Sequence, residues 1–305
     1  MLITIFTATY KGERLLPKLF ESLMRQTNKN FEWVLVNDGS PDDTDEVVKT
    51  MQDKADFTLR YFKKPNGGKT TAVNMGIQLA QGELWLIVDH DDFLSDDAIE
   101  VINRYYPEIK EDENICSVTF LRHHLDGKPI GTQNNPDNLI SDFCSYRTVL
   151  NIVGDRAEVV KTDYFRKYCP IPTFENENNC FDGYIWLMLA KEYKTLFIAN
   201  EKPLYYCEYL STGRSTKTYH TPLGDMYLHN LFASMKQTNI RQKFHAYGRY
   251  WYKFFIAKNM SFREAYRNLS HKWGVIALPL GVLALCFKWR QKALGFLPIL
   301  MPKTN

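Results

Sequence analysis

Short apolar runs alternate with helical segments through the first 106 residues, and this alternation constrains the fold more than any other feature of the chain. Four apolar, β-branched runs predict buried strands, at residues 2–7, 31–37, 59–62 and 83–88. The segments between and after them predict helices, at residues 15–24, 42–51, 69–80 and 97–106. Such an order predicts an α/β fold, in which a doubly wound, mostly parallel sheet carries helices on both faces.

The pattern loosens after about residue 112. Further strands are predicted at residues 115–121, 195–199 and 204–209, and a helix at residues 181–192. Residues 222–270 are helical in pattern, and they are rich in aromatic and basic side chains. We therefore expect a helical extension beyond the α/β part of the chain.

Length, composition and cysteine spacing narrow the class of protein. The chain has 305 residues, of which 45% are hydrophobic and 24% charged, and this excludes disordered and collagen-like proteins. Its six cysteines form no Cys-x-x-Cys pair, which indicates neither a zinc site nor a disulfide framework and favours a reducing compartment. The N-terminal residues predict a strand rather than a signal peptide, so we expect a cytoplasmic location.

Polar residues follow three of the predicted strands at the point where each strand ends. Thr9 and Tyr10 follow the first strand, Asp38 follows the second, and Asp89-His90-Asp91-Asp92 follows the fourth. In a parallel sheet with helices on both faces, ligands bind at the carboxyl ends of the strands. The sequence therefore predicts a ligand site built from these residues.

The Asp89–Asp92 segment is the strongest local signal for chemistry. Three carboxylates within four residues repel one another unless a positive charge lies nearby, and a divalent ion that bridges phosphates would supply it. Mg²⁺ and Mn²⁺ accept one or two carboxylates together with phosphate oxygens. The alternative is a solvated loop in which an aspartate caps the next helix.

The Asn66-Gly67-Gly68-Lys69 segment opens a predicted helix. It lacks the first glycine of a P-loop, because the position five residues before Gly68 is Lys63. A glycine loop at a helix start still suits a phosphate group, and Lys69 is placed to contribute a charge there.

These segments together resemble the family 2 glycosyltransferases, whose catalytic domain has the GT-A fold. The resemblance rests on TATYKGERLL, VLVNDGSPDDT, KKPNGGKTTAVNMGI and GELWLIVDHDD, which occur in the family's order within residues 1–110. It continues more weakly through residues 154–172, 181–190 and 205–216. That second half is similar to bacterial members that make cell-surface polysaccharides.

The resemblance implies nucleotide-sugar-binding roles for the residues at the strand ends. Thr9 and Tyr10 match positions beside the nucleotide base, and Asp38 matches the carboxylate that contacts the base. The positions near the sugar and the phosphates are Lys69 beside the donor, Asp89 at the ribose or diphosphate end, Asp91 as the metal ligand, and Asp92 beside it.

The resemblance also implies residues on the acceptor side. Asp182 aligns with the family's general base, although Phe181 stands where many members have glutamate, so the alignment rests on Asp182 and Trp186. Arg214 matches a contact to the diphosphate or the acceptor. The chain has no Gln/Arg-x-x-Arg-Trp motif of the processive synthases, which favours transfer of a single sugar.

The implied function is an inverting, Mn²⁺- or Mg²⁺-dependent transfer of a sugar from a nucleotide donor, usually UDP-linked. The implied acceptor is a glycan or a polyprenyl-diphosphate-linked sugar in bacterial surface polysaccharide synthesis. Three alternatives stay open. They are a nucleotidyltransferase, a catalytically inactive relative, and a nucleic-acid binder. A nucleotidyltransferase is expected to have a glycine-rich loop directly after the first strand, where this sequence has Thr9-Tyr10-Lys11.

The charge distribution suggests a membrane partner. Residues 241–305 hold twelve Lys/Arg and one acid, Glu264, whereas the first 240 residues hold 26 Lys/Arg and 34 Asp/Glu. Residues 273–287 are uncharged but shorter than a membrane span, which needs about 20 residues. Because long uncharged runs suit lipid better than nucleic acid, we expect this tail to hold the protein on the anionic inner face of the plasma membrane. The alternative is a purely structural role, in which this segment forms a C-terminal helix that covers the core.

We therefore expect three parts. Residues 1–216 form the GT-A domain, divided into a nucleotide-sugar-binding half (1–110) and an acceptor half (111–216). Residues 217–272 form a helical, basic extension, and residues 273–305 form a membrane-associating tail.

Overall fold

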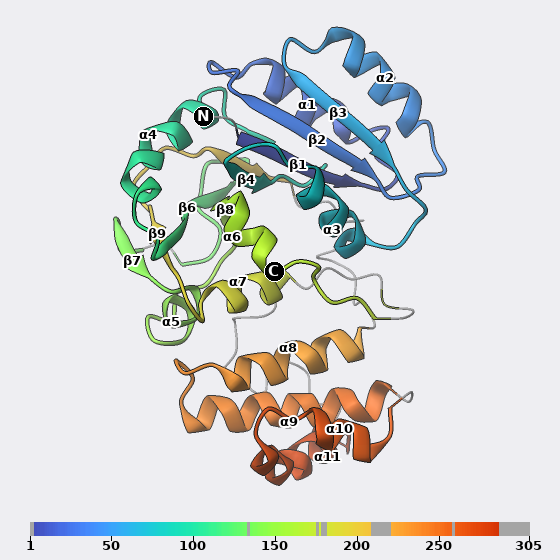
Figure 1. The fold of residues 1–305 in the computed structure, drawn as a ribbon, viewed down its shortest axis with the longest axis vertical. Coiled ribbons are helices and arrows are strands. Elements are labelled where there is room, and N and C mark those ends of the chain that lie inside the picture. The colour runs from blue at the N-terminus through green and yellow to red at the C-terminus, as the bar shows by residue number, and fades with distance from the viewer. Residues whose placement is uncertain are drawn as a thin grey trace.

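The computed structural model describes residues 3–132, 135–174, 177, 182–208, 221–257 and 260–286. Its first half is built on four parallel strands in the order β3-β2-β1-β4 (Figure 1). These strands are β1 (Ile3–Thr9), β2 (Phe31–Asn37), β3 (Thr58–Lys63) and β4 (Leu84–Ile87). All four lie where the sequence predicts strands. Because they are parallel, the carboxyl ends of β1, β2 and β4 meet at one edge of the sheet.

The second half extends this sheet with strands of mixed direction. β8 (Arg156–Lys161) lies antiparallel between β4 and β6 (Ile115–His124). On β6, β9 (Lys194–Phe197) and β10 (Tyr205–Cys207) both pair in parallel. Two short antiparallel strands complete the sheet, β7 (Leu139–Ser141) on β9 and β5 (Phe93–Leu94) on β10.

Helices cover both faces of the sheet because side chains alternate along each buried strand. In β2, Trp33 and Leu35 face one core and Val34 and Val36 face the other. The first core is covered by α1 (Leu16–Met24), α2 (Thr44–Lys54) and α4 (Ala98–Lys110). The second is covered by α3 (Lys69–Leu79), α5 (Phe143–Thr148), α6 (Thr162–Lys167) and α7 (Asp182–Leu189). The predicted α/β fold is thus confirmed.

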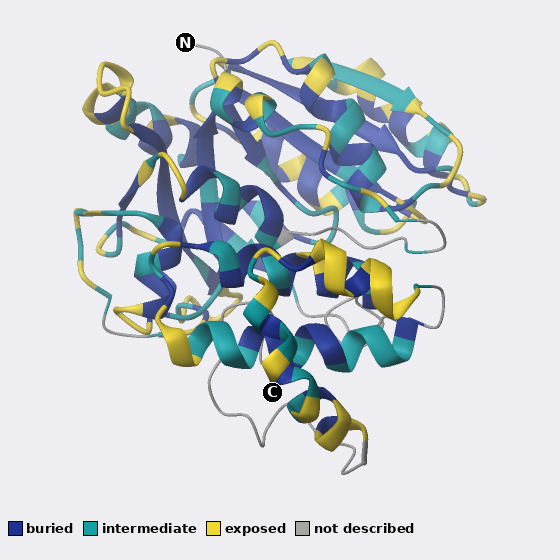
Figure 2. Cartoon of the chain, turned by 60° about the horizontal axis from the view of Figure 1, so that its bottom comes forward, coloured by how far each residue is buried: buried dark blue, intermediate teal, exposed yellow. Residues whose placement is uncertain are grey.

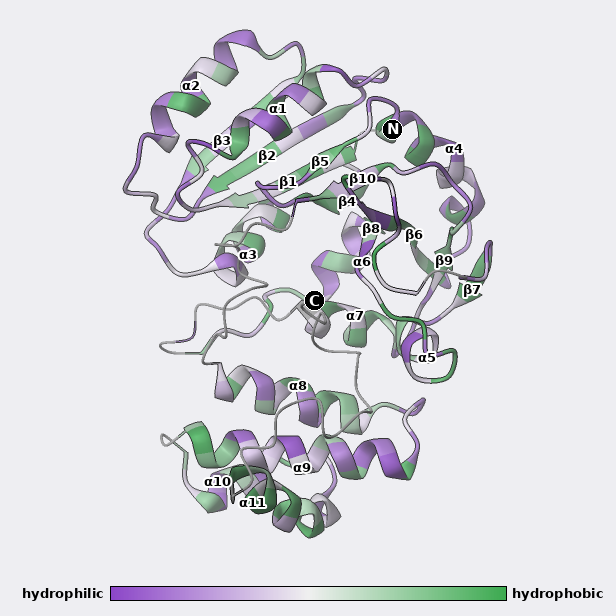
Figure 3. Ribbon diagram, turned by 180° about the vertical axis from the view of Figure 1, so that it is seen from behind, coloured by the Kyte–Doolittle hydropathy of each residue, from purple (hydrophilic) through white to green (hydrophobic). Residues whose placement is uncertain are grey.

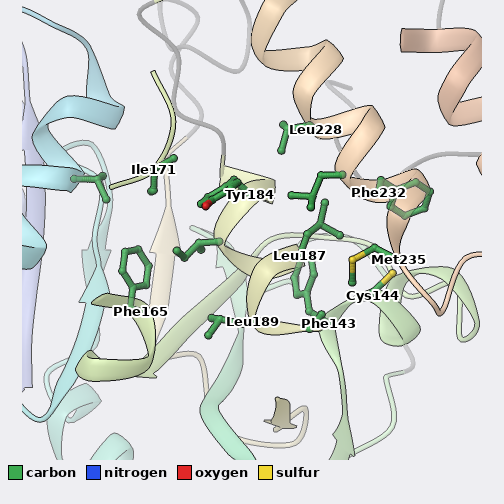
Figure 4. Packing of buried hydrophobic residues seen from close by; sticks show 14 of the residues in the cluster. Phe143, Cys144, Phe165, Ile171, Tyr184, Leu187, Leu189, Leu228, Phe232 and Met235 are labelled. Carbon is green, nitrogen blue, oxygen red and sulfur yellow. The ribbon is translucent and has the colours of Figure 1, made fainter. Parts of the chain in front are cut away.

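The C-terminal part is helical, as the sequence predicts for residues 222–270. It consists of α8 (Pro222–Ser234), α9 (Ile240–Ala257), α10 (Phe262–Asn268), the 3₁₀ helix η2 (Lys272–Ala277) and α11 (Leu278–Cys286). In Figure 1 these helices lie below α7, with α8 between α7 and α9. Figure 4 shows Leu228 and Phe232 of α8 packed toward Leu187 of α7. One hydrophobic core therefore runs from the sheet into this helical layer.

The described part of the predicted tail, residues 273–286, packs against α9. The indole Nε1 of Trp251 donates a hydrogen bond to the carbonyl oxygen of Gly274 at 3.0 Å. A side chain at Gly281 would meet Trp251 at 2.7 Å, so the backbone of α11 approaches α9 closely. No helix among the described ranges is both long and apolar enough to cross a membrane.

A truncation in α8 tests whether the sheet and the helical layer unfold together. Phe232 is fully buried in the shared core, so we expect Phe232→Ala to lower the free energy of unfolding by about 3–5 kcal/mol. Denaturant unfolding should give one transition by tryptophan fluorescence and by circular dichroism. The control is Ile240→Ala, since Ile240 is 69% exposed and should change stability by no more than about 0.5 kcal/mol. A separate early transition of the helices, with the sheet unaffected, would contradict the expectation.

Candidate active site

The carboxylate of Asp38 holds the glycine loop against the end of β2. Its Oδ1 accepts hydrogen bonds from the Gly67 backbone N–H at 3.0 Å and from Lys64 Nζ at 2.6 Å. Its Oδ2 accepts from the Gly68 N–H at 2.7 Å and from Asn66 Nδ2 at 3.2 Å. Because a carboxylate has about four lone-pair directions, these four donors saturate the Asp38 side chain.

The neighbouring glycine is needed for the same contact. Gly39 has φ +73°, a backbone conformation that residues other than glycine rarely adopt. A Cβ atom there would also lie 2.7 Å from the backbone nitrogen of Asn66. Asp38 and the glycine loop can approach each other because position 39 carries no side chain.

Thr9, at the end of β1, joins the Asp38 loop to the Asp89–Asp92 loop. Its carbonyl oxygen accepts a hydrogen bond from the Asp38 backbone N–H at 2.8 Å. Its hydroxyl lies 2.9 Å from Nδ1 of His90. The two acidic segments that the sequence predicts at one sheet edge are therefore in contact through a single residue. Tyr10, the next residue, is 44% exposed at this edge.

Lys69 forms an ion pair with Asp89, from the first residue of α3 to the end of β4. The distance from Lys69 Nζ to Asp89 Oδ1 is 2.6 Å. Burial by itself would raise the pKa of Asp89, but the charges of Lys69 and Arg122 outweigh it and hold that pKa well below its usual range. Asp89 is thus a carboxylate whose charge is matched within the protein.

Asp92 is tied to β10. Its Oδ2 accepts a hydrogen bond from the Tyr205 hydroxyl at 2.8 Å, and its Oδ1 accepts one from the Glu208 backbone N–H at 3.1 Å. The same Tyr205 hydroxyl accepts a hydrogen bond from the Asp89 N–H at 3.2 Å, so one side chain holds both ends of the loop. Burial and the charge of Asp89 raise the pKa of Asp92 to about 7, although Arg122 opposes the shift.

Asp91 differs from its two neighbours. It is partly buried, forms no ion pair, and its carboxylate bonds to no other residue among those that the structure describes. Burial and the charge of Asp89 raise its pKa. A hard oxygen donor without a protein cation fits the ligand preference of Mg²⁺ or Mn²⁺. The described residues contain no cluster of three His, Cys, Asp or Glu side chains that could hold a metal by themselves, so phosphate oxygens would have to complete the coordination of any ion here.

The acceptor-side candidates are described only in part. Asp182 is the first residue of α7, but its side chain lies outside the described set, and so does the whole of Arg214. The segment that leads to α7 is fixed to α3. Asn74 donates to the carbonyl oxygen of Ile171 at 2.8 Å and accepts from its N–H at 2.7 Å. Ile171 is thus fixed to the helix that begins at the glycine loop.

Four residues of this region were not predicted from the sequence: Lys64, Asn74, Arg122 and Tyr205. Lys64 stands directly before the glycine loop, and that position was the available signal for it. Arg122 and Tyr205 are neighbours because β6 and β10 pair in parallel, with the Arg122 guanidinium 4.2 Å from the centre of the Tyr205 ring. Since 83 residues separate them in the chain, local pattern carries no signal for this pair.

The sequence pattern of the family described as "Glycosyl transferase family 2" matches residues 4–157, half of the chain. The chain belongs to this family. The matched residues include β1 to β4, both acidic loops and the glycine loop. The predicted family is confirmed.

Two curated relatives come from Bacillus subtilis and Streptococcus pneumoniae. The chain is 28% identical over 156 residues to the Bacillus subtilis "Minor teichoic acid biosynthesis protein GgaB", which covers 47% of this chain and 17% of that protein. It is 34% identical over 110 residues to the Streptococcus pneumoniae "Glycosyltransferase GlyA", which covers 36% of this chain and 16% of that protein. The chain matches less than a fifth of the length of either relative.

Solved structures extend the likeness to the whole fold. TarS 1–349 of S. aureus, in complex with UDP-GlcNAc, superimposes with a TM-score of 0.60 at 17% identity, over 92% of this chain and 79% of that one. The mannosyltransferase PcManGT of Pyrobaculum calidifontis, in complex with GDP-Man and Mn²⁺, gives a TM-score of 0.50 at 15% identity, over 97% of this chain and 78% of that one. At these identities the likeness shows the fold, and the predicted GT-A fold is confirmed.

Removing the hydroxyl of Tyr205 tests how the acidic loop is held. We expect Tyr205→Phe to lower the free energy of unfolding by about 1–3 kcal/mol, because the partly buried Asp89 N–H loses its acceptor and the buried Asp92 carboxylate loses a donor. Denaturant titration measures the change. The matched control is Tyr206→Phe on the same strand, since no hydrogen bond of the Tyr206 hydroxyl to a described residue is present. Equal stabilities of the two variants would show that Tyr205 does not hold the loop.

Proposed function

We propose that this chain is an inverting glycosyltransferase that moves a single sugar from a UDP-sugar to a glycan or polyprenyl-diphosphate-linked acceptor in bacterial surface polysaccharide synthesis. The observation that carries the proposal is the contact of Thr9 with both acidic loops, in a chain of glycosyl transferase family 2. The ligand of TarS, UDP-GlcNAc, supports a UDP-linked donor, and the name of GgaB supports a cell-surface polymer as the product.

The donor would bind along the edge formed by β1, β2 and β4. Thr9, Tyr10 and Asp38 are proposed to lie beside the base. Because the Asp38 carboxylate is saturated by the glycine loop, a base can contact it only by replacing one of the four donors, and Lys64 or Asn66 is the side chain that can rotate away. Lys69, Asp89 and Asp92 are proposed for the ribose and diphosphate end, with Asp92 acting through its hold on β10.

Mn²⁺ or Mg²⁺ is the proposed cofactor, with Asp91 as its protein ligand. PcManGT is a fold relative that binds Mn²⁺ together with its nucleotide sugar, which supports this proposal. When bound, such an ion stabilises the negative charge that develops on the departing diphosphate. Asp91 is suited to hold it because its carboxylate has no internal cation, in contrast to Asp89, which Lys69 neutralises.

Asp182 is the proposed general base. Its carboxylate would take the proton of the acceptor hydroxyl while the hydroxyl oxygen attacks the anomeric carbon from the face opposite the diphosphate. The bond from that carbon to the diphosphate oxygen breaks as the glycosidic bond forms, and this inverts the anomeric centre. Arg214 is the proposed contact to the diphosphate or the acceptor.

A screen of nucleotide sugars tests the function. The purified chain, with Mn²⁺ or Mg²⁺ and a membrane extract as the source of acceptor, should release UDP from one UDP-sugar. Asp182→Asn should lower turnover by about 10²–10⁴-fold with unchanged donor affinity, because general-base catalysis contributes that much. The matched control is Asp163→Asn, an exposed aspartate on α6. Wild-type turnover in Asp182→Asn would make the base assignment wrong, and donor binding without any transfer would favour an inactive relative.

The helical layer supports the proposed anionic membrane partner at the cytoplasmic face. Several apolar side chains on η2 and α11 are exposed, which are Ile276, Val282, Leu283 and Leu285. In Figure 3 most of α11 has the colour of hydrophobic residues, and Figure 2 shows exposed positions on the C-terminal helices. Arg263 and Arg267 of α10 are exposed as well. An apolar surface beside basic side chains is the pattern of a protein that lies on an anionic bilayer.

Substitution of this surface tests the membrane partner better than deletion of residues 273–305, because Gly274 and Ala277 are buried against the protein. We expect Val282→Gln with Leu283→Gln to weaken binding to anionic phospholipid vesicles roughly tenfold, since apolar area no longer enters the bilayer. Vesicle sedimentation measures the binding. The control pair is Leu125→Gln with Val149→Gln, which are exposed outside the helical layer. Equal binding of both double variants would reject this surface as the membrane contact.

A further inference from the structure

The contact between α8 and α9 contains a row of ionisable side chains, which we call the α8–α9 seam: Asp225 and His229 of α8, and Arg249 and Lys253 of α9. Each pair is one helical turn apart, so its members lie on the same face of their helix. Lys253 Nζ lies 2.5 Å from Asp225 Oδ2, and this ion pair joins the two helices. The seam continues past it with two groups that lack such a partner.

The guanidinium of Arg249 makes no hydrogen bond or ion pair with any described residue, although the side chain is partly buried. Burial lowers the pKa of Arg249, and Asp225 is the carboxylate that opposes the shift. His229 is 4% exposed, and its Nδ1 is buried without a hydrogen-bond partner. Burial, followed by the charges of Arg249 and Lys253, holds the pKa of His229 well below its usual range, so its imidazole is neutral.

The sequence that follows residue 208 offers little negative charge to neutralise the seam. From residue 209 to residue 305 the sequence contains two acids, Asp225 and Glu264. Asp225 is already paired with Lys253, and Glu264 lies on α10, where it is exposed. A partly buried guanidinium that lacks a counter-charge lowers stability, whereas a bound anion would provide that counter-charge.

We propose that the α8–α9 seam is a binding site for a phosphate group, held by Arg249 together with Lys253 and His229. A guanidinium presents two parallel N–H donors to a phosphate, and a neutral imidazole adds one donor. The chemical class of the ligand is a phosphate monoester, diester or diphosphate. Carboxylate ligands fit less well, because three donors from two helices match a tetrahedral anion.

The seam lies beside the acceptor half of the protein. The Glu177 carboxylate accepts hydrogen bonds from the Leu223 and Gly224 N–H groups, at 2.7 and 2.9 Å, in the first turn of α8. Glu177 belongs to the segment that leads to α7 and Asp182. Tyr227, on the opposite side of α8 from Asp225 and His229, packs against Tyr184 of α7 with ring centres 5.9 Å apart. In this position the seam would hold a phosphate group of the acceptor. That assignment, unlike the binding site itself, rests on the proposed function.

The test uses the full chain with saturating UDP, so that the donor site does not report the added anion. Calorimetric titration with sodium diphosphate, and separately with inorganic phosphate, should give binding to the wild-type protein. Arg249→Met should weaken this binding at least tenfold, while the ligand-free melting temperature stays equal or rises because an uncompensated charge is gone. The matched control is Arg263→Met, an exposed arginine on α10 that forms no ion pair with a described residue, and this variant should bind diphosphate as the wild type does.

A second variant and a vesicle arm keep the outcomes separate. Arg249→Lys keeps the charge but loses the paired donors, and it should bind diphosphate with an affinity between those of the wild type and Arg249→Met. If the phosphate came from a lipid headgroup instead, Arg249→Met would lose vesicle binding but not binding of soluble diphosphate. Equal diphosphate affinity of the wild type, Arg249→Met and Arg263→Met would overturn the inference and leave the proposed transfer reaction intact. Loss of binding in Arg249→Met without any sugar transfer by the wild type would support the site and reject the proposed function.

Discussion

The arrangement of the candidate site depends on the contact between Asp38 and the glycine loop. Asp38 follows β2 and receives two backbone N–H groups from residues 67 and 68, so it determines where α3 begins relative to the sheet. Lys69 is the first residue of that helix, and its position sets the ion pair with Asp89. The saturated Asp38 carboxylate thus fixes the position of the glycine loop, and through Lys69 it also fixes the position of the Asp89–Asp92 loop. The same saturation means that Asp38 has a structural role whether or not a nucleotide base reaches it.

Charge balance separates the three aspartates of the Asp89–Asp92 loop into different tasks. Asp89 has Lys69 as its cation, and Asp92 has the Tyr205 hydroxyl and the Glu208 N–H. Arg122 lies 3.9 Å from Asp92 and lowers the energetic cost of its burial. Asp91 is the member of the loop that forms no ion pair with a described residue. The three carboxylates can lie close together because Lys69 balances the charge of Asp89, and because burial and the charge of Asp89 raise the pKa of Asp91 and of Asp92, which reduces the negative charge of the loop.

The first half of the fold was predictable because its strands are buried and apolar, and its helices carry apolar side chains at regular spacing. β1 to β4 and α1 to α4 therefore agree with the sequence prediction to within a few residues at each end. β8 was missed because Arg156, Glu158 and Lys161 interrupt its apolar pattern. Arg156 and Lys161 are nevertheless buried and Glu158 is partly buried, and the guanidinium of Arg156 donates a hydrogen bond to the side-chain oxygen of Asn135. Because β8 was missed, the mixed strand directions on either side of it could not be predicted either.

The candidate site shows the same limit. The strand ends predicted that Asp38 and Asp89–Asp92 would share an edge, because parallel strands place their carboxyl ends together. The sequence could not predict which partner each aspartate has, since the partners come from positions far apart, such as the hydrogen-bond donor Tyr205 for Asp92.

The C-terminal helices connect this edge to the rest of the molecule. α8 is fixed to the preceding part of the chain through Glu177 and through the core around Leu187, while its other face contributes to the α8–α9 seam. α9 packs on α8 on one side and on η2 and α11 on another. A group bound at the seam, and a surface bound at α11, would therefore both act on the start of α7 through rigid helices. Because the helical extension shares a hydrophobic core with the sheet, we expect truncation to disturb the fold where point substitutions on its surface would not.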